Sequence, residues 1–231
     1  MSAIVRDESF GSDEENFAER VLCTLLIDGS LSMSNDSKID QLNAALHLFK
    51  SELMADPLAS ISVRLNIIRF GGLNGKDTAH VVTDWTEARE FTPPTVTAAG
   101  QTPLGRGLSL AMESIAEEKA SLRAIGISMK RPWLFILTDG QPNDPWEAAA
   151  AQCREGEKSG KFIVWPIGIG QDANFDVLRR MSSRNFALEV GEAKFRELFQ
   201  WLSDSMKSVS NSRAGEVLAL PSPTDIFKVH A

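Results

Sequence analysis

The sequence has no hydrophobic run that approaches the roughly 20 apolar residues of a membrane-spanning helix. Its first residues are acidic, whereas a secretory signal begins with basic residues and continues with an apolar stretch. It has only two cysteines, Cys23 and Cys153, and neither lies in a CxxC pair or near a metal-ligand residue. We therefore expect a cytoplasmic protein with no membrane partner and with two buried free thiols.

Positive charge is also scarce. The 231 residues include 24 Lys and Arg against 31 Asp and Glu, which gives a formal net charge of −7. The first 20 residues alone hold six acidic and two basic residues. A protein that binds nucleic acid directly presents an excess of Lys and Arg to the phosphates. We therefore expect no nucleic acid partner.

The hydrophobic content, 43% of the residues, is enough for one sizeable core, and the length suits one domain with short extensions. Residues 1–19 are polar, charged and without period, which predicts a flexible acidic N-terminal arm. We expect the domain to occupy residues 20–210 and to be a monomer. Residues 211–231, which include ALPSPTDIF, predict an extended C-terminal arm.

Strand and helix patterns alternate along this domain. VLCTLLI at 21–27 is continuously apolar, which predicts a central strand of a parallel sheet, covered on both faces. Apolar residues at steps of three and four over 39–53 predict an amphipathic helix that ends at Pro57. ISVRLNIIRF and HVVTDW predict two antiparallel strands, because the turn GGLNGKD between them is too short for a parallel crossover.

The remaining patterns continue the alternation. A helix begins just past Thr102, and a strand follows in RPWLFILTDG. Strands alternating with helices imply a doubly wound α/β sheet with right-handed crossovers. The later predicted elements are a helix at 146–159, a strand in FIVWPIGIG, a short helix at 175–181, a short strand at 187–190 and a helix at 193–209.

Two of the predicted strands end in Asp-Gly, at Asp28 and at Asp139. Each aspartate alone could simply cap a helix. In an open α/β sheet, however, ligands bind beyond the carboxyl ends of the strands, where the strand order reverses. If the two strands are neighbours at that reversal, their carboxylates face one crevice and repel each other unless a cation or a proton lies between them.

Three hydroxyl groups can join this crevice, those of Ser30, of Ser32 and of Thr102, which comes just before a predicted helix. Ser30 and Ser32 follow Asp28 at two-residue spacing, which in an extended loop puts all three side chains on one side. Hard oxygen ligands with few carboxylates suit Mg²⁺, with Mn²⁺ or Ca²⁺ as alternatives. Such an ion keeps much of its charge, so an acidic group of a partner protein could complete its coordination shell. The predicted metal ligands are Asp28, Ser30, Ser32, Thr102 and Asp139.

DGSLS at 28–32, Thr102 within GQTPLG and Asp139 within LTDG resemble the three-part metal-ion-dependent adhesion site (MIDAS) of von Willebrand factor A (VWA) domains. The resemblance extends in order and spacing across roughly residues 20–210. It implies that Ser30, Ser32 and Thr102 coordinate directly, while Asp28 and Asp139 act mostly through waters. It also implies a Rossmann-like, mostly parallel six-stranded sheet of order 3-2-1-4-5-6, with the third strand antiparallel and helices on both faces.

A narrower resemblance concerns the biological setting. The PLG after Thr102, the segment GIGQDANFDVLRRMS and the LPSP tail resemble the bacterial TerY-like VWA branch, which is associated with tellurium resistance. This implies a stress or phospho-signalling system with a kinase, phosphatase or stress protein as partner. A VWA subunit that couples to an AAA⁺ ATPase, as in chelatase-like complexes, stays open as an alternative. Leu31 replaces the small residue often found between the two serines and makes the rim more apolar.

Enzymatic readings have less support. In a Mg²⁺-dependent phosphatase of the haloacid-dehalogenase type, Asp28 would attack phosphate, but the second acid needed two residues later is Ser30 here. The hydrolase motif GxSxG is absent. The three histidines, at 47, 80 and 230, fall on a predicted helix, a strand start and the tail. With no base in reach of the aspartates, we expect binding and not catalysis.

Overall fold

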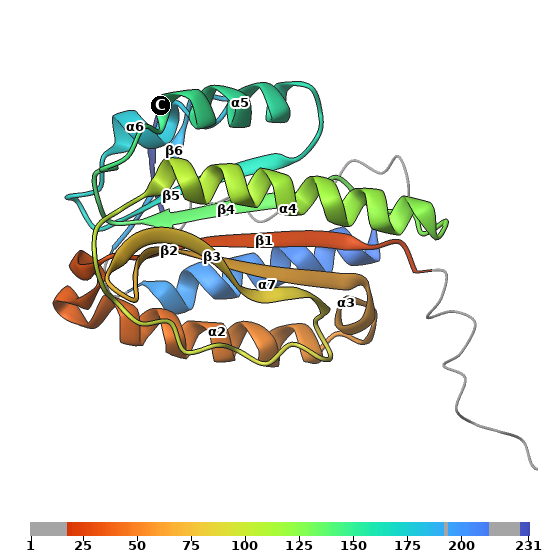
Figure 1. The fold of residues 1–231 in the computed structure, drawn as a ribbon. Coiled ribbons are helices and arrows are strands. Elements are labelled where there is room, and N and C mark those ends of the chain that lie inside the picture. Colours follow the sequence, from red (N-terminus) through yellow and green to blue (C-terminus); the bar gives the residue numbers. More distant parts are fainter. Residues whose placement is uncertain (1–17, 192–193, 213–226) are drawn as a thin grey trace, which may run out of the picture.

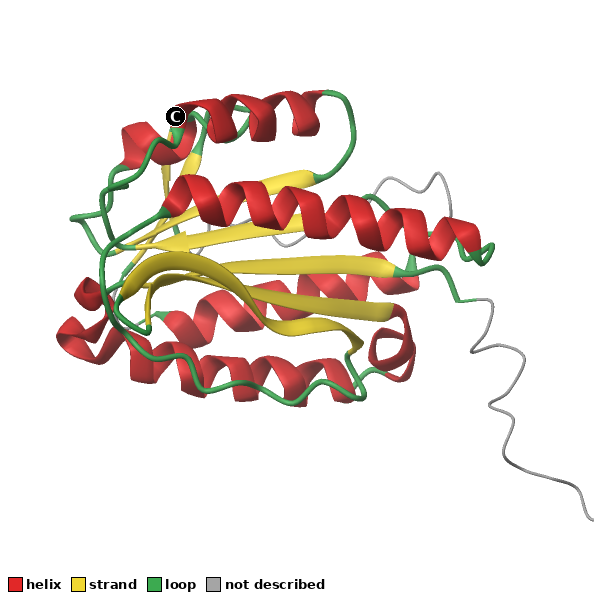
Figure 2. Cartoon of the chain, viewed as in Figure 1, coloured by secondary structure: helices red, strands yellow, loops and turns green. Residues whose placement is uncertain are grey.

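The computed structural model describes residues 18–191, 194–212 and 227–231. They form an α/β fold in which one twisted sheet lies between two layers of helices (Figures 1 and 2). The strands are β1 (Val21–Gly29), β2 (Val63–Leu73), β3 (Lys76–Glu87), β4 (Trp133–Thr138), β5 (Ile163–Ile169), β6 (Ala187–Val190) and β7 (Lys228–His230). The helices are η1 (Leu31–Ser37), α2 (Lys38–Met54), α3 (Pro57–Ser62), α4 (Leu104–Ala124), α5 (Glu147–Lys158), α6 (Phe175–Arg179) and α7 (Phe195–Asn211).

The sheet has the order β3-β2-β1-β4-β5-β6-β7. β1 is an interior strand, third in this order. It pairs in parallel with β2 and β4 and has all nine residues buried, as its apolar run predicts. β3 runs antiparallel to β2, which also confirms the prediction. The connecting turn uses Asn74 and Gly75, both with positive φ, which suits a tight turn between twisted strands.

Each face of the sheet carries its own apolar core. α2 and α7 cover one face, where Phe49 and Phe199 pack edge to face at 5.6 Å between ring centroids. α4, α5 and α6 cover the other, where Leu108 and Cys153 are fully buried. Figure 1 shows the two layers on opposite sides of the strands. The double cover explains why the central strands have no polar, solvent-facing side.

The sequence prediction needs two corrections. The sheet has seven strands and not six, because residues 228–230 form β7, antiparallel to β6 at the sheet edge. The last residues of the expected C-terminal arm therefore belong to the sheet, while 213–226 and the first 17 residues lie outside the described part. In addition, Pro57 begins the short helix α3, and the Asp56 carboxylate caps it by accepting a hydrogen bond from the Ala59 amide at 2.8 Å.

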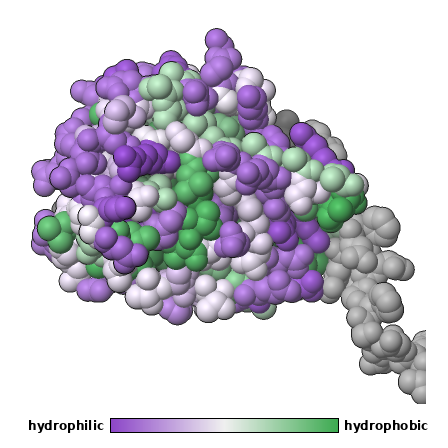
Figure 3. Space-filling view, in the orientation of Figure 1, coloured by the Kyte–Doolittle hydropathy of each residue, from purple (hydrophilic) through white to green (hydrophobic). Residues whose placement is uncertain are grey.

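The surface is mostly polar. Figure 3 shows hydrophilic residues over most of the visible face, with a hydrophobic strip across its middle. Six large apolar side chains are exposed among the described residues, and Leu31, at 62% exposure, is one of the most exposed. None of the described helices combines the length and the apolar character that crossing a bilayer requires.

Candidate metal centre

The sheet brings the two predicted aspartates to one edge. β1 and β4 are parallel neighbours with Ile27 opposite Leu137. Asp28 comes one residue after Ile27 and Asp139 two residues after Leu137, so both lie at the same end of the sheet. The chain moves outward from β1 to β2 and β3 on one side, and β4 begins the other side. The strand order therefore reverses between β1 and β4, which is where open α/β sheets bind ligands.

A chain of hydrogen bonds joins the loop after β1 to the end of β4. The Asp28 Oδ1 accepts a hydrogen bond from the Ser30 amide at 2.8 Å, which fixes the loop. The Ser30 and Ser32 hydroxyls are 2.9 Å apart, and the Ser32 hydroxyl donates to Asp139 Oδ1 at 2.6 Å. Since a hydroxyl has one proton, the Ser30 hydroxyl donates to Ser32. The two serines and two aspartates thus form one cluster.

Thr102 borders the same space from the segment before α4. A Cβ placed on Gly140 would lie 3.1 Å from the Thr102 Oγ1 and 3.7 Å from the Asp28 Oδ2. Glycine leaves that position open between the two oxygens. Thr138, the last residue of β4, donates its hydroxyl proton to the same Asp28 oxygen. The structure therefore brings all five predicted site residues to one place.

Lys38 is a member of this cluster that the sequence interpretation missed. Its ammonium group lies 2.9 Å from Asp139 Oδ2, and both side chains are nearly inaccessible, at 6% and 1% exposure. Lys38 is also the first residue of α2, where the partial positive charge of a helix N-terminus disfavours a cation. That mismatch is the signal that could have pointed to an acidic partner.

Burial dominates the electrostatics of Asp28. The carboxyl is fully buried, which raises its pKa to about 6, although hydrogen bonds from Thr138 and Ser30 oppose the shift. The nearby Asp139 contributes a smaller upward effect on the same pKa. A cation beside the two carboxylates would favour their charged forms. The site is therefore electrostatically suited to one.

Arg69 on β2 holds the loop after β1 in place through hydrogen bonds to backbone carbonyls. Its Nη2 donates to the Gly29 carbonyl at 2.7 Å and to the Thr97 carbonyl at 2.8 Å. A Cβ at position 29 would lie 2.2 Å from Arg69 Nε, so the guanidinium can reach this carbonyl only if residue 29 is glycine. The glycine after Asp28 thus serves the packing of Arg69.

The donor set fits a hard cation. Two carboxylates and three hydroxyls supply oxygen only, which suits Mg²⁺ and not a thiolate- or imidazole-seeking metal. In the part of the chain described, no group of three or more His, Cys, Asp and Glu side chains could hold a metal. Hydroxyl oxygens would therefore have to supply most of the coordination at this edge of the sheet.

Family comparison agrees with the fold and the order of these segments. The sequence model described as von Willebrand factor type A domain matches residues 24–201. The chain belongs to this family. No curated protein shows significant sequence similarity to it beyond that.

Solved structures resemble this VWA domain at low sequence identity. A von Willebrand factor type A protein from Catenulispora acidiphila superposes with a TM-score of 0.60 at 17% identity, over 82% of this chain and 43% of its own. The VWA domain of the pilus tip protein Mfa5 from Porphyromonas gingivalis gives 0.60 at 13%, over 87% and 99%. The mussel byssus proximal thread matrix protein 1 with a zinc-occupied MIDAS motif gives 0.54 at 16%, over 81% and 48%. The chain thus spans less than half of the first and third of these proteins.

The VWA domain has a further long-range contact near the site. Asp144 accepts hydrogen bonds from the Gly105 and Arg106 amides, both at 2.9 Å. Asp144 therefore caps the first turn of α4 from 38 residues away, and so holds the Thr102 segment against the loop after β4.

Proposed function

We propose that this VWA domain holds one Mg²⁺ at a MIDAS and uses the ion to bind a carboxylate of a partner protein. The hydrogen-bonded cluster of the Asp28–Ser32 loop with Thr138 and Asp139, which Thr102 borders at the strand-order reversal, supports this most directly. Mn²⁺ or Ca²⁺ would fit the same oxygens. The proposed ligand set is Asp28, Ser30, Ser32, Thr102 and Asp139.

The five residues would differ in whether they coordinate the ion directly or through water. Both Asp28 oxygens already accept hydrogen bonds from the protein, from the Ser30 amide and the Thr138 hydroxyl. This supports a role for Asp28 through water, and for the three hydroxyls as direct ligands. An ion held mainly by neutral hydroxyls and waters keeps most of its positive charge. It would therefore attract an acidic side chain from outside.

Leu31 would tune the choice of partner. It lies between the two serines and is 62% exposed, so an apolar group stands at the rim of the metal site. A partner that places an apolar side chain beside its acidic residue would bury the exposed part of Leu31, which stabilises the contact by about 1–2 kcal/mol if burial is complete. We therefore propose an acidic–apolar recognition segment on the partner.

The biological setting remains part of the proposal. A TerY-like role in a bacterial stress or phospho-signalling system is the first candidate, and coupling to an AAA⁺ ATPase is the alternative. Some of the similar structures are named as a pilus adhesin and a pilus tip protein, names that favour a binding role over a catalytic one. The buried free thiols of Cys23 and Cys153 support a reducing, cytoplasmic location.

The contacts of the two aspartates also weigh against a phosphatase. A nucleophilic aspartate needs an oxygen that faces the substrate, but Asp28 is fully buried with hydrogen bonds on both oxygens. Asp139 is held between the Ser32 hydroxyl and the Lys38 ammonium. The oxygens of both carboxylates thus accept hydrogen bonds from the protein itself and do not present a nucleophile, which supports binding and not catalysis.

Calorimetry tests the metal site. Titration of MgCl₂ or MnCl₂ into metal-free protein should give one site per chain, and Asp28→Ala or Thr102→Ala should abolish the binding heat while unfolding stays cooperative. Asp40→Ala, at an exposed acidic position on α2, is the matched control and should bind as the unaltered protein does. Equal metal affinity in all variants would mean that the site lies elsewhere.

A pulldown tests the partner. Extract of the native cell, analysed by mass spectrometry, should yield a protein captured in Mg²⁺ and lost in EDTA. Thr102→Ala should lose the same protein even in Mg²⁺, and Leu31→Ser should weaken its capture while metal binding is unchanged. Capture that ignores the chelator would contradict the metal-bridged contact but not the fold.

A further inference from the structure

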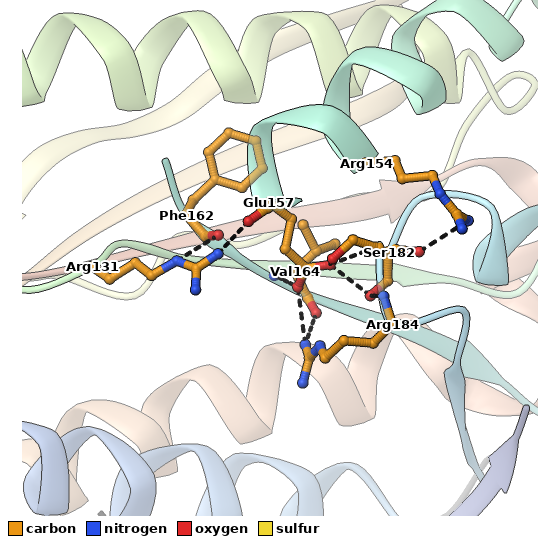
Figure 4. A network of polar contacts seen from close by, with 8 residues as sticks. Arg131, Arg154, Glu157, Phe162, Val164, Ser182 and Arg184 are labelled. Carbon is orange, nitrogen blue, oxygen red and sulfur yellow. Dashed lines mark hydrogen bonds and ion pairs between the residues drawn. The ribbon is translucent and has the colours of Figure 1, made fainter. Parts of the chain in front are cut away.

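A pocket lies at the opposite end of the sheet from the candidate metal centre. It has a volume of about 560 Å³ and opens where the chain enters β4 and β5 and leaves α5. Figure 4 shows three arginines gathered there around one buried glutamate. The pocket is lined by Arg131, Arg154, Glu157, Lys158, Ile163, Ser183 and Arg184.

Four of the seven lining residues are cationic and one is acidic, in a chain whose net charge is −7. Within the described residues, the only ion pair that involves these four cations joins Arg184 to Glu157 at 3.2 Å. Three positive charges at the pocket are therefore not balanced by a carboxylate. This is a local excess of positive charge on an acidic protein.

Backbone carbonyls orient the guanidinium groups. Arg131 donates from Nε to the Phe162 carbonyl at 3.0 Å and from Nη2 to the Glu157 carbonyl. Arg184 donates to the Val164 carbonyl at 2.5 Å. A guanidinium has five N–H groups. Arg131 uses two of them in these bonds, and Arg184 uses one besides its ion pair with Glu157. The remaining donors are thus available in fixed directions, which favours planar oxyanions.

Glu157 is satisfied by the protein itself. Its carboxylate accepts hydrogen bonds from the Val164 amide at 2.9 Å, the Ser182 hydroxyl at 2.8 Å and the Ser183 amide at 2.6 Å. Burial acts to raise the pKa of Glu157, but these hydrogen bonds and Arg184 together hold the pKa below its usual value. Glu157 therefore organises the pocket wall and leaves the outer cations uncompensated.

The cations also repel one another. Arg154 and Lys158 are four residues apart on α5, a spacing at which like charges destabilise a helix. The pKa of Arg184 is lowered, chiefly by burial, and the charge of Arg131 acts in the same direction. The helix C-terminus alone would account for Lys158, but not for Arg131 and Arg184, which come from two other segments. An anion in the pocket would relieve the repulsion.

We propose that this pocket binds a small phosphate-bearing anion. Arginines match phosphate oxygens with paired N–H groups, and lysine adds a mobile point charge. The pocket volume falls within the range of roughly 300–1,000 Å³ typical of small-molecule sites, so it accommodates more than a single inorganic phosphate. Pyrophosphate, which carries several charged oxygens on two phosphorus centres, is the simplest probe.

Titration calorimetry with sodium pyrophosphate tests the proposal in buffer freed of metals by a chelating resin, so that neither Mg²⁺ nor EDTA competes. The protein should bind one pyrophosphate per chain, and added NaCl should weaken binding. The double variant Arg154→Gln/Lys158→Gln removes two exposed charges and should weaken binding at least about tenfold. Lys76→Gln, at the exposed first residue of β3 and at the other end of the sheet, removes one positive charge and should have no effect.

Arg131→Lys separates charge from geometry. It keeps the charge but loses the fixed N–H pair, so it should weaken pyrophosphate binding by several-fold while the melting temperature and the Mg²⁺ titration report an intact fold and metal site. Absent binding, equal loss in Lys76→Gln, or equal affinity for citrate would overturn the proposal. Citrate tests whether carboxylates suffice, and inorganic phosphate tests whether one phosphoryl group does. Because metals are absent, failure here leaves the MIDAS proposal untouched.

Discussion

The ammonium group of Lys38 adds a positive charge to the oxygen cluster of the metal-free site. It lies against one oxygen of Asp139, while Ser32 binds the other. Without it, Asp139 would lose this ion pair and lie buried near Asp28. At the scale of single residues, Lys38 thus balances the charge of the metal-free site and opposes, through its own charge, the binding of a second cation.

We expect Lys38→Met to lower the free energy of unfolding of the metal-free protein by about 3 kcal/mol, because it leaves a buried carboxylate unpaired. The same variant should bind Mg²⁺ about tenfold more tightly, since a repelling charge is gone. Lys38→Arg keeps the charge and is the control. Denaturant titration without and with MgCl₂ measures both effects, and unchanged Mg²⁺ affinity would contradict the electrostatic role.

Asp28 makes the metal-free stability depend on pH. Its folded-state pKa, raised by burial to about 6, lies above the ordinary value of 3.8, so the folded protein binds the proton more tightly than the unfolded chain. The free energy of unfolding should therefore rise by about 1 kcal/mol between pH 7 and pH 5 and be lost again as pH rises through 6. Asp28→Asn should lack this component, which the difference between the two denaturation curves isolates.

At the scale of elements, periodicity predicted most of the fold because burial repeats along each element. The apolar run at 21–27 predicted β1. The short turn predicted that β3 pairs antiparallel with the strand before it, and the short strand pattern at 187–190 predicted β6. β7 was missed because three residues are too few for a period, and its pairing with β6 depends on a long return of the chain. α3 was missed because Pro57 also serves as a helix stop.

The candidate site divides in the same way. The five proposed oxygen ligands could be named from the sequence because they lie in motifs at the ends of β1 and β4 and just before α4. Lys38, Arg69 and Asp144 were not, because each acts on a group 38 or more residues away. Whether two such residues meet depends on the finished sheet, which local patterns do not specify.

Glu157, near the end of α5, is a buried residue that joins several elements. Glu157 binds the start of β5 and the segment after α6. Glu157→Ala should lower the free energy of unfolding by about 3–5 kcal/mol, because four buried or partly buried donors and Arg184 lose their acceptor. Glu155→Ala, exposed on the same helix, should change it by less than about 0.5 kcal/mol. Chemical denaturation of both variants provides the measurement.

For the molecule as a whole, the last described residues close the far edge of the sheet. Phe227 is 5% exposed and packs edge to face on Trp201, and the His230 ring stacks on Phe175 at 3.8 Å. β7 pairs along β6 and covers its backbone groups. The C-terminal segment is therefore part of the folded unit.

Deleting residues 227–231 should lower the free energy of unfolding by about 3 kcal/mol, since it exposes the site of Phe227 and uncovers β6. Val229→Thr, at a partly exposed position of β7, should cost under about 0.5 kcal/mol. Thermal and denaturant unfolding of the truncated protein and of the Val229→Thr variant would measure both losses of stability. Equal stability of the truncated protein would mean that β7 is not integral to the sheet.

The parallel strand β4 has a consequence for how the two ends of the domain could be used together. Arg131 stands just before it and Asp139 just after it. Eight steps of extended chain span about 26 Å, and a hydrogen-bonded strand between two neighbours does not shorten. No small molecule reaches both ends, and two ligands bound there would not collide. If both proposals hold, β4 is a fixed-length spacer, and the domain can tether an acidic protein at one end while it carries a phosphorylated ligand at the other.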